Sequence, residues 1–299
     1  MIRRSALRIT AMATSLLCAL SGRTSHAQES PSIQSAVHTA REPATPQLRY
    51  NLPLDLGVTL GAGALSLTLE LLSSKLAPSS CHWCDRDSSG RDTLNGFDAS
   101  LRSSLRWSNT TAANRASNLF SYGLAPAAGL GLGAFIVWRD NRVDELPLDL
   151  LILAEAAILA VDANQISKII VGRERPYVHF RSAADRESNR SSSDNVSFYS
   201  GHTSFAFTLA AAGGTIASLR QYRLAPLIWA TGMTLAAVSG YLRVAADRHY
   251  ASDVLVGAVV GSAIGFSVPY FGHAPVAKDV HLAAMPTEGG AGLMLWGRW

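Results

Sequence analysis

Charged residues are scarce in this chain. Asp, Glu, Lys and Arg make up 16% of its 299 residues, whereas 48% are hydrophobic, a balance more apolar than that of an average soluble domain. The formal net charge is only +4, and the basic residues are scattered rather than gathered in a stripe. A basic stripe is what proteins that bind nucleic acid usually carry. We therefore expect no nucleic-acid partner.

Cysteine is also scarce, with three residues in the chain. Cys18 lies within residues 1–27, which have a basic start, the apolar stretch "ITAMATSLLCAL" and the small-residue sequence "SHA" before Gln28. These are the features of a signal peptide, and Leu17 is too bulky for a lipidation site at Cys18. We expect export to the cell envelope, in the inner membrane or the periplasm. The alternative is an uncleaved membrane anchor.

Export bears on Cys81 and Cys84, which form the sequence "CHWC". An oxidising compartment favours a disulfide between two cysteines this close together. A CxxC pair can instead be a redox centre or half of a zinc site, but neither a second pair nor a βαβ pattern accompanies it. The sequence therefore predicts a disulfide between Cys81 and Cys84.

Long apolar stretches dominate the remaining chain, each of a length that suits a spanning or fully buried helix. They cover residues 54–74, 119–138, 146–171, 203–219, 224–242 and 251–271. In the last stretch Gly257, Gly261 and Gly265 recur at every fourth position, a spacing that allows close helix packing. We predict an all-α fold, a bundle of about six core helices that is membrane-embedded or membrane-associated.

The sequence divides into five segments. They are the signal peptide at 1–27, a linker at 28–50, an N-terminal helix with the CxxC loop at 51–118, a helical domain at 119–272 and a C-terminal tail at 273–299. The tail has two short apolar runs around Gly289 and Gly290, a pattern typical of a small hairpin.

The membrane topology is left open by the sequence. Asp55, Glu70, Glu155 and Asp162 fall inside apolar stretches, and ionisable groups in hydrocarbon are costly unless they face the bundle interior or a wet site. Three crossings after a cleaved signal would place the end of the third stretch on the cytoplasmic side. The alternatives are that one early helix does not span, with the first as the weakest candidate, or that the bundle is an exported globule held loosely at a membrane.

Polar residues gather at the ends of the apolar stretches. In "KIIVGRERP", Lys168 and Arg175 are about two turns apart, on roughly the same face of a helix that Pro176 would close. Such cations also occur at ordinary helix ends, where they complement the dipole. In "YSGH", Ser200, Gly201 and His202 precede a helix expected from about Thr203, and a helix N-terminus attracts anions.

A third polar group occurs in "YLRVAADRHYASD", which contains Arg243, His249 and Asp253. Four residues apart on a helix, the Asp253 carboxylate can accept a hydrogen bond from the His249 imidazole. This would fix the imidazole tautomer and make its other nitrogen a better nucleophile or base. Helix order brings all three groups to one end of the bundle, where fixed cations and N–H groups form a site for an oxyanion such as phosphate.

The order and spacing of the three groups resemble the type 2 phosphatidic acid phosphatase and vanadium haloperoxidase superfamily. The resemblance covers roughly residues 120–270 and consists of "KIIVGRERP", "YSGH" and "LRVAADRHYASD". The chain departs from the family pattern at two positions, where Tyr199 replaces the usual proline and Leu242 the usual serine. Neither position is charged or nucleophilic, so catalysis remains compatible with both changes.

The resemblance implies a role for each matching residue. His249 would attack phosphorus to form a phosphohistidine, Asp253 would orient it, and His202 would protonate the leaving alkoxide and later activate water. The residues expected to hold the phosphate are Lys168, Arg175, Ser200, Gly201 and Arg243. No metal cofactor is expected, because the cations would stabilise the growing negative charge.

The apolar bundle favours a lipid substrate for this metal-independent phosphatase, such as phosphatidate, an isoprenyl diphosphate or a phosphorylated envelope lipid. A small soluble phosphate ester is the second substrate class. Two other functions fit the same residues: a haloperoxidase in which His249 would ligate vanadate, and an inactive relative that serves as a transporter or scaffold.

Overall fold

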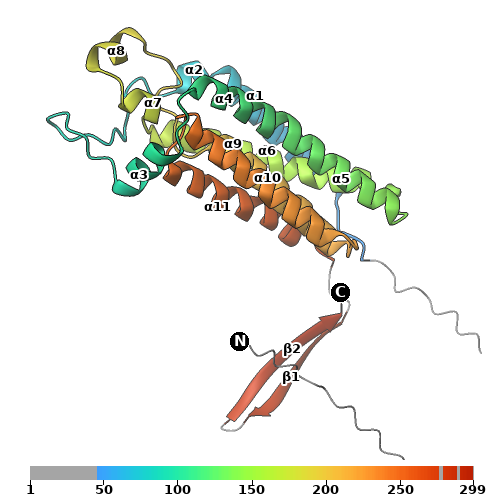
Figure 1. Cartoon of the computed structure of the whole chain (residues 1–299). Coiled ribbons are helices and arrows are strands. Elements are labelled where there is room, and N and C mark those ends of the chain that lie inside the picture. Colours follow the sequence, from blue (N-terminus) through green and yellow to red (C-terminus); the bar gives the residue numbers. More distant parts are fainter. Residues whose placement is uncertain (1–45, 276–278, 288–289, 299) are drawn as a thin grey trace, which may run out of the picture. The chain divides into compact units, whose positions relative to one another are not determined.

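The computed structural model describes residues 46–275, 279–287 and 290–298. The predicted signal peptide and most of the predicted linker lie outside these residues. Long helices dominate the described part of the chain (Figure 1). They are α1 (Leu52–Leu71), α4 (Thr110–Leu119), which continues through the π-helical turn η1 (Phe120–Leu124) into α5 (Ala125–Arg139), α6 (Leu146–Val171), α9 (Gly201–Leu219), α10 (Ala225–Ala245) and α11 (Ala251–Ser267). The predicted all-α bundle is confirmed.

Shorter elements join these helices. They are α2 (Ser73–Leu76), α3 (Gly96–Leu105), the 3-10 turn η2 (Val143–Glu145), α7 (Pro176–His179), α8 (Ala183–Ser188) and the π-helical turn η3 (Val268–Gly272). The tail forms the predicted hairpin, in which β1 (Asp279–Thr287) pairs antiparallel with β2 (Gly290–Arg298).

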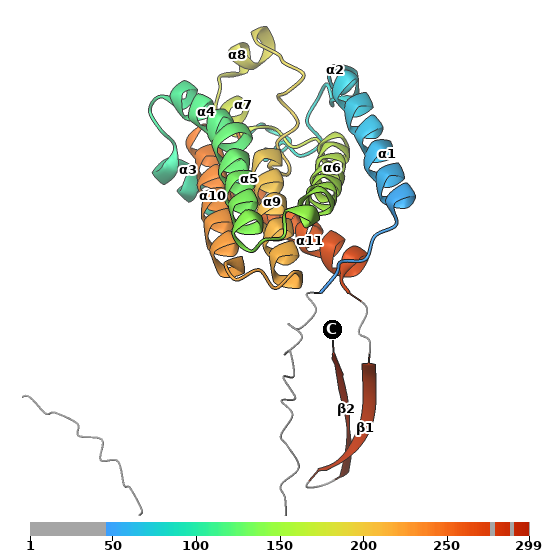
Figure 2. The same cartoon turned by 90° about the vertical axis from the view of Figure 1, so that its right-hand side faces the viewer.

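Helix α9 is the centre of the bundle. It contacts α11, α10, α6 and α5, and Figure 2 shows it among these four helices. Its interface with α11 is close, because a Cβ atom added to Gly257 would lie 2.8 Å from the Ser200 carbonyl oxygen. Cβ atoms added to Gly261 and Gly265 would lie still closer to backbone oxygens of α9. The glycine repeat therefore allows the backbones of α9 and α11 to touch.

Four helical segments are long and apolar enough to cross a membrane: Leu52–Leu71, Thr110–Arg139, Ala225–Ala245 and Ala251–Gly272. Many large hydrophobic side chains on these segments are exposed, as at Leu60, which is 70% exposed. Polar side chains of α1 turn inward instead, since Asp55 is buried and the Ser66 hydroxyl donates a hydrogen bond to Asp162 of α6. This distribution suits a bundle surrounded by lipid.

Two residues that the sequence interpretation placed on helices lie outside them at the polar end of the bundle. Helix α6 ends at Val171, because Gly172 takes the left-handed conformation (φ +57°) that terminates helices. Arg175 therefore lies in the following loop and not on the helical face of Lys168. Likewise, α11 begins at Ala251 with Tyr250 as its N-cap, so His249 precedes the helix.

Candidate active site

The predicted site residues come together where α6 and α10 end and where α9 and α11 begin. Ser200 is the N-cap of α9, and its hydroxyl pairs with the Thr203 hydroxyl at 2.8 Å instead of capping the helix. Gly201 is required by close approach: an added Cβ would lie 2.6 Å from Asn164 Oδ1 and 3.1 Å from Lys168 Nζ. The ammonium group of Lys168 thus lies directly beside the first turn of α9.

Arg175 and Arg243 lie near Lys168, and these three residues are called the cationic wall below. The Arg175 guanidinium donates hydrogen bonds to the carbonyl oxygens of Ser193 (2.7 Å) and Arg248 (3.1 Å). Arg243 reaches Ser117 Oγ at 3.1 Å. Both arginines are more than nine-tenths buried, and none of the ion pairs among the described residues includes either of them. Such cations are prepared to bind a negatively charged ligand.

His249 lies among these cations and is held by a backbone oxygen. Its Nδ1 is 2.7 Å from the Ser197 carbonyl oxygen, and it is 3.7 Å from Asp253 Oδ2, beyond hydrogen-bond distance. Since a carbonyl oxygen only accepts, Nδ1 carries the proton and Nε2 keeps its lone pair. The expected hydrogen bond from His249 to Asp253 is therefore wrong, because His249 precedes the helix on which Asp253 lies.

The charge state of His249 agrees with this tautomer. Burial, with the positive charges of Arg175, Arg243 and Lys168, holds the pKa of His249 well below its ordinary value. The imidazole is therefore neutral at physiological pH. A neutral imidazole with a free Nε2 is a competent nucleophile.

Asp253 supports the nucleophile indirectly. Its carboxylate accepts hydrogen bonds from the Ser197 hydroxyl (2.6 Å), from the Tyr250 backbone N–H (3.0 Å) and from Arg173 (2.7 Å). Ser197 is the residue whose carbonyl oxygen holds His249. Asp253 thus fixes the segment that positions the imidazole, and it also caps α11.

Arg173 is a site component that the sequence interpretation missed. Its fully buried guanidinium pairs with Asp253 (2.7 Å), Asp98 (2.9 Å) and Asp85 (3.1 Å). The rings of Trp83 and Tyr250 lie on it, with centroids 4.1 and 4.0 Å from Cζ. Only the extra arginine within "GRERP" hinted at such a role, because its carboxylate partners are distant in sequence.

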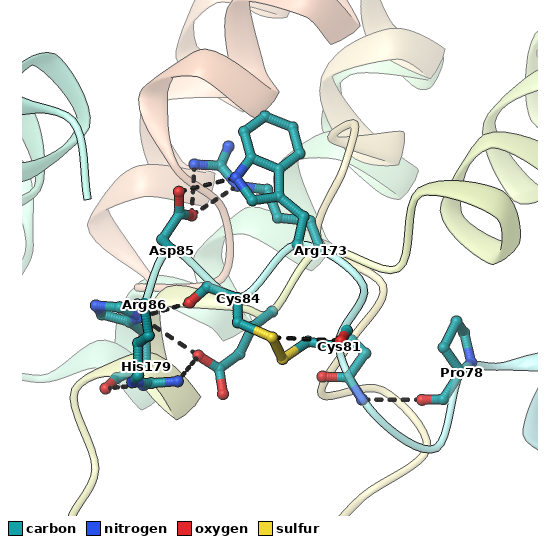
Figure 3. Close-up of a disulfide and its surroundings, with 10 residues drawn as sticks. Pro78, Cys81, Cys84, Asp85, Arg86, Arg173 and His179 are labelled. Carbon is teal, nitrogen blue, oxygen red and sulfur yellow. Dashed lines mark hydrogen bonds and ion pairs between the residues drawn. A yellow bond between two sulfur atoms is a disulfide. The ribbon is translucent and has the colours of Figure 1, made fainter. Parts of the chain in front are cut away.

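The cysteine pair lies beside the segment that follows α6. Cys81 and Cys84 form a disulfide, and the loop that they close is docked on the segment between Lys168 and Arg175. The backbone N–H of His82 donates to the Gly172 oxygen (3.0 Å), and the Glu174 N–H donates to the Trp83 oxygen (3.0 Å). In Figure 3 the loop runs from this disulfide to Asp85, which faces the guanidinium of Arg173.

His202 has partners that the sequence interpretation also missed. Its Nε2 lies 2.9 Å from Asn118 Oδ1, and its ring packs on Tyr122 with the centroids 4.4 Å apart. The Tyr122 hydroxyl is 3.4 Å from Nδ1. Both partners come from the segment of α4 and η1, whose beginning was not visible as an apolar stretch.

The two departures from the family pattern are packing positions. Tyr199 is 3% exposed, and its carbonyl oxygen accepts a hydrogen bond from Asn164 at 2.7 Å. Leu242 is also buried. Neither residue is one of the five expected to hold the phosphate.

A cavity of about 270 Å³ borders the cationic wall and is lined by both Lys168 and Arg175. A group that could hold a metal lies elsewhere, where ligand atoms of Asp55, Glu155 and His273 are all within 4.8 Å of one another. His273 is already paired with Glu155 at 3.4 Å. Glu155 lies 13 residues before Lys168 on α6, about 20 Å along the helix, so this group is not part of the anion site.

Comparison with known proteins concerns the part of the chain that contains these site residues. Residues 149–275 match the PAP2 superfamily, and they include the seven polar side chains predicted for the site from Lys168 to Asp253 as well as Gly201. The match covers less than half of the chain. The resemblance inferred from the three sequence motifs is confirmed.

Two similar proteins show how much of the chain the similarity covers. A lipid A 1-phosphatase of Porphyromonas gingivalis is 41% identical over 69 residues, which are 23% of this chain and 15% of that protein. The crystal structure of the first transmembrane PAP2 type phosphatidylglycerolphosphate phosphatase from Bacillus subtilis aligns with a TM-score of 0.43 and 20% identity. That alignment covers 69% of this chain and 95% of the other.

Proposed function

We propose that the protein is a metal-independent phosphatase that hydrolyses a lipid phosphate in the cell envelope through a phosphohistidine at His249. The observation that carries the proposal is the state of His249, which is neutral, has a free Nε2 and lies among three cations. A structural histidine would need no such cluster of positive charge.

The reaction has two steps. Nε2 of His249 attacks phosphorus, the bond from phosphorus to the ester oxygen breaks, and His202 donates a proton to the leaving oxygen. Burial and the neighbouring cations lower the pKa of His202 to about 2, so His202 takes up this proton from solvent only once the negative charge of the bound phosphate offsets those cations. His202 then takes a proton from water, whose oxygen attacks the phosphohistidine. Inorganic phosphate leaves, and the free Nε2 of His249 is restored.

The positive charges stabilise both transition states. Lys168, Arg175 and Arg243 hold the equatorial oxygens, together with the N–H groups at the start of α9 near Ser200 and Gly201. Because these groups are already oriented and buried, little reorganisation is needed when negative charge develops. We therefore propose that no metal ion takes part.

A lipid substrate is supported by an apolar cavity of about 360 Å³ among α5, α6, α9 and α10. Phe205 and Ser121 line it, and these are close in sequence to His202 and its partner Tyr122. An acyl chain in this cavity would extend from the site into the apolar part of the bundle. Similarity to the lipid A 1-phosphatase favours a phosphorylated envelope lipid over a soluble ester.

The test is phosphate release by the purified protein in EDTA. The substrates are phosphatidate, an undecaprenyl diphosphate, a lipid A 1-phosphate and a soluble aryl phosphate, with His249→Ala as the control. We expect release that survives EDTA, vanishes in the variant and is fastest with one of the lipids. Failure of the folded wild-type protein to release phosphate from any of them would overturn the proposal. A vanadate-dependent halide oxidation assay would then test the haloperoxidase function.

A further inference from the structure

The buried network around Arg173 contains more carboxylates than its single guanidinium neutralises. Asp98 and Asp253 have no exposed surface, and Asp85 is the third partner of Arg173. Burial alone would raise the pKa of Asp98, but hydrogen bonds from Ser252, Asn95 and Arg173 outweigh it and lower that pKa. Asp98 is therefore ionised, and removing the Arg173 charge would leave buried carboxylates without their cation.

One side of this network reaches the nucleophile through three short contacts. Arg173 Nη1 donates to Asp253 Oδ1 at 2.7 Å, and the Ser197 hydroxyl donates to Asp253 Oδ2 at 2.6 Å. The Ser197 carbonyl oxygen in turn accepts the Nδ1–H of His249 at 2.7 Å. The position of His249 therefore depends on where Arg173 holds Asp253.

The other side of the network reaches the disulfide loop. Trp83 stacks on the Arg173 guanidinium, and its indole N–H donates to Asp85 Oδ1 at 2.8 Å. Asp85 Oδ2 accepts from Arg173 at 3.1 Å. Trp83 lies inside the ring closed by Cys81 and Cys84, and Asp85 follows it directly, so the disulfide limits the movement of both contacts.

We propose that Arg173 is a positioning residue for the phosphatase reaction, and that the Cys81–Cys84 loop holds it in place. The proposed path from the loop to the reaction runs through Arg173, Asp253 and Ser197, and none of the loop residues contacts His249 among the described hydrogen bonds. This inference rests on the proposed function for its kinetic consequence, but its structural consequence can be measured without catalysis.

The expected kinetic effect separates positioning from substrate binding. In Arg173→Met the cationic wall stays intact, so KM should change by less than about threefold, whereas kcat should fall at least tenfold because a small misplacement of a reacting group is costly. Arg173→Lys keeps the charge but loses the planar fork that reaches two carboxylates, and it should recover only part of the loss.

Arg86→Met is the matched control. Arg86 also ties this loop to the segment after α6, because it donates to Glu174 (2.6 Å) and to the His179 oxygen, but it does not contact Asp253. We expect Arg86→Met to lower the melting temperature and to leave kcat per folded molecule within about twofold. If Arg86→Met and Arg173→Met lower kcat equally, the loop acts through general stability and the proposal is wrong.

The disulfide is tested by reduction with dithiothreitol in the full-length protein. The dithiol breaks the S–S bond, each cysteine sulfur gains one hydrogen, and dithiothreitol is oxidised to its cyclic disulfide. Reduction should lower kcat several-fold with little change in KM. Cys81→Ser/Cys84→Ser should behave like the reduced protein and should no longer respond to dithiothreitol, whereas an unchanged kcat in both would overturn the role of the loop.

Hydrogen exchange gives a readout that does not depend on activity. Amides near Ser197, including that of Ser197 itself, which donates to the Arg173 oxygen at 3.0 Å, should exchange faster after reduction and in Arg173→Met than in Arg86→Met. Faster exchange in a protein without phosphatase activity would support the positioning network while the proposed function fails. Unchanged exchange would overturn the network even in an active enzyme.

Discussion

The two histidines of the site are supported in different ways. His249 is almost completely buried, and a backbone oxygen backed by a charged network holds it. His202 is less buried, and its contacts are the side chains of Asn118 and Tyr122 on one neighbouring helix. The difference matches the proposed roles, because a nucleophile must keep one tautomer and one direction, whereas an acid and base must give up and regain a proton.

The largest effect expected from this comparison is that of His249→Ala. Without a nucleophile the covalent route is lost, and kcat should fall by about four orders of magnitude or more. Rapid acid quench with a 32P-labelled substrate should show phosphoenzyme in the wild type and none in the variant. Label in the His249→Ala protein would place the covalent step at another residue.

His202→Gln should lower kcat by about 10²- to 10⁴-fold for an alkyl ester, because the leaving oxygen is no longer protonated. The loss should be much smaller for p-nitrophenyl phosphate, whose leaving group needs no proton. Phosphohistidine should then accumulate, since water activation is also impaired. An equal loss for both substrates would argue against the role of His202 as an acid.

Asn118→Ala should have a smaller effect, about tenfold in kcat, because it removes the partner of His202 Nε2 but leaves the imidazole in place. Its effect should appear with the alkyl ester and nearly vanish with p-nitrophenyl phosphate, as for His202→Gln. Asn114→Ala provides a comparison on the same helix, since Asn114 contacts Arg243 instead, at 3.2 Å. Its effect should be similar for both substrates.

The smallest effect concerns pH. Because burial and the neighbouring cations lower the pKa of His249, this residue keeps its lone pair as the pH falls through the ordinary histidine range. Activity should therefore show no loss due to His249 near pH 6.5.

The pH dependence of stability should differ from that of activity. His249 binds a proton below about pH 6.5 in the unfolded chain but not in the native protein, so this residue should destabilise the fold progressively as the pH falls below that value. Denaturation in urea at several pH values, with His249→Gln as control, measures that contribution.

The three sequence motifs already contained both histidines of the site, because the proposed reaction requires particular residue types at short spacings. The motifs did not identify the groups that contact the two histidines. Ser197 holds His249 through its backbone, which no side-chain pattern reports, and Asn118 belongs to a helix that is polar at its start. The pairing of His249 with Asp253 was wrong because it assumed that the helix began before Tyr250.

The long apolar stretches, the glycine repeat of α11 and the order of the three motifs were sufficient to predict the bundle and the end at which the polar groups meet. These features are local and periodic, so a single sequence displays them. Tertiary structure alone decided that Arg173 joins Asp85, Asp98 and Asp253, and that a disulfide loop lies on it. The physical reason is that a buried charge finds its partners by proximity in the fold, and the carboxylates around Arg173 are 75 to 88 residues away in sequence.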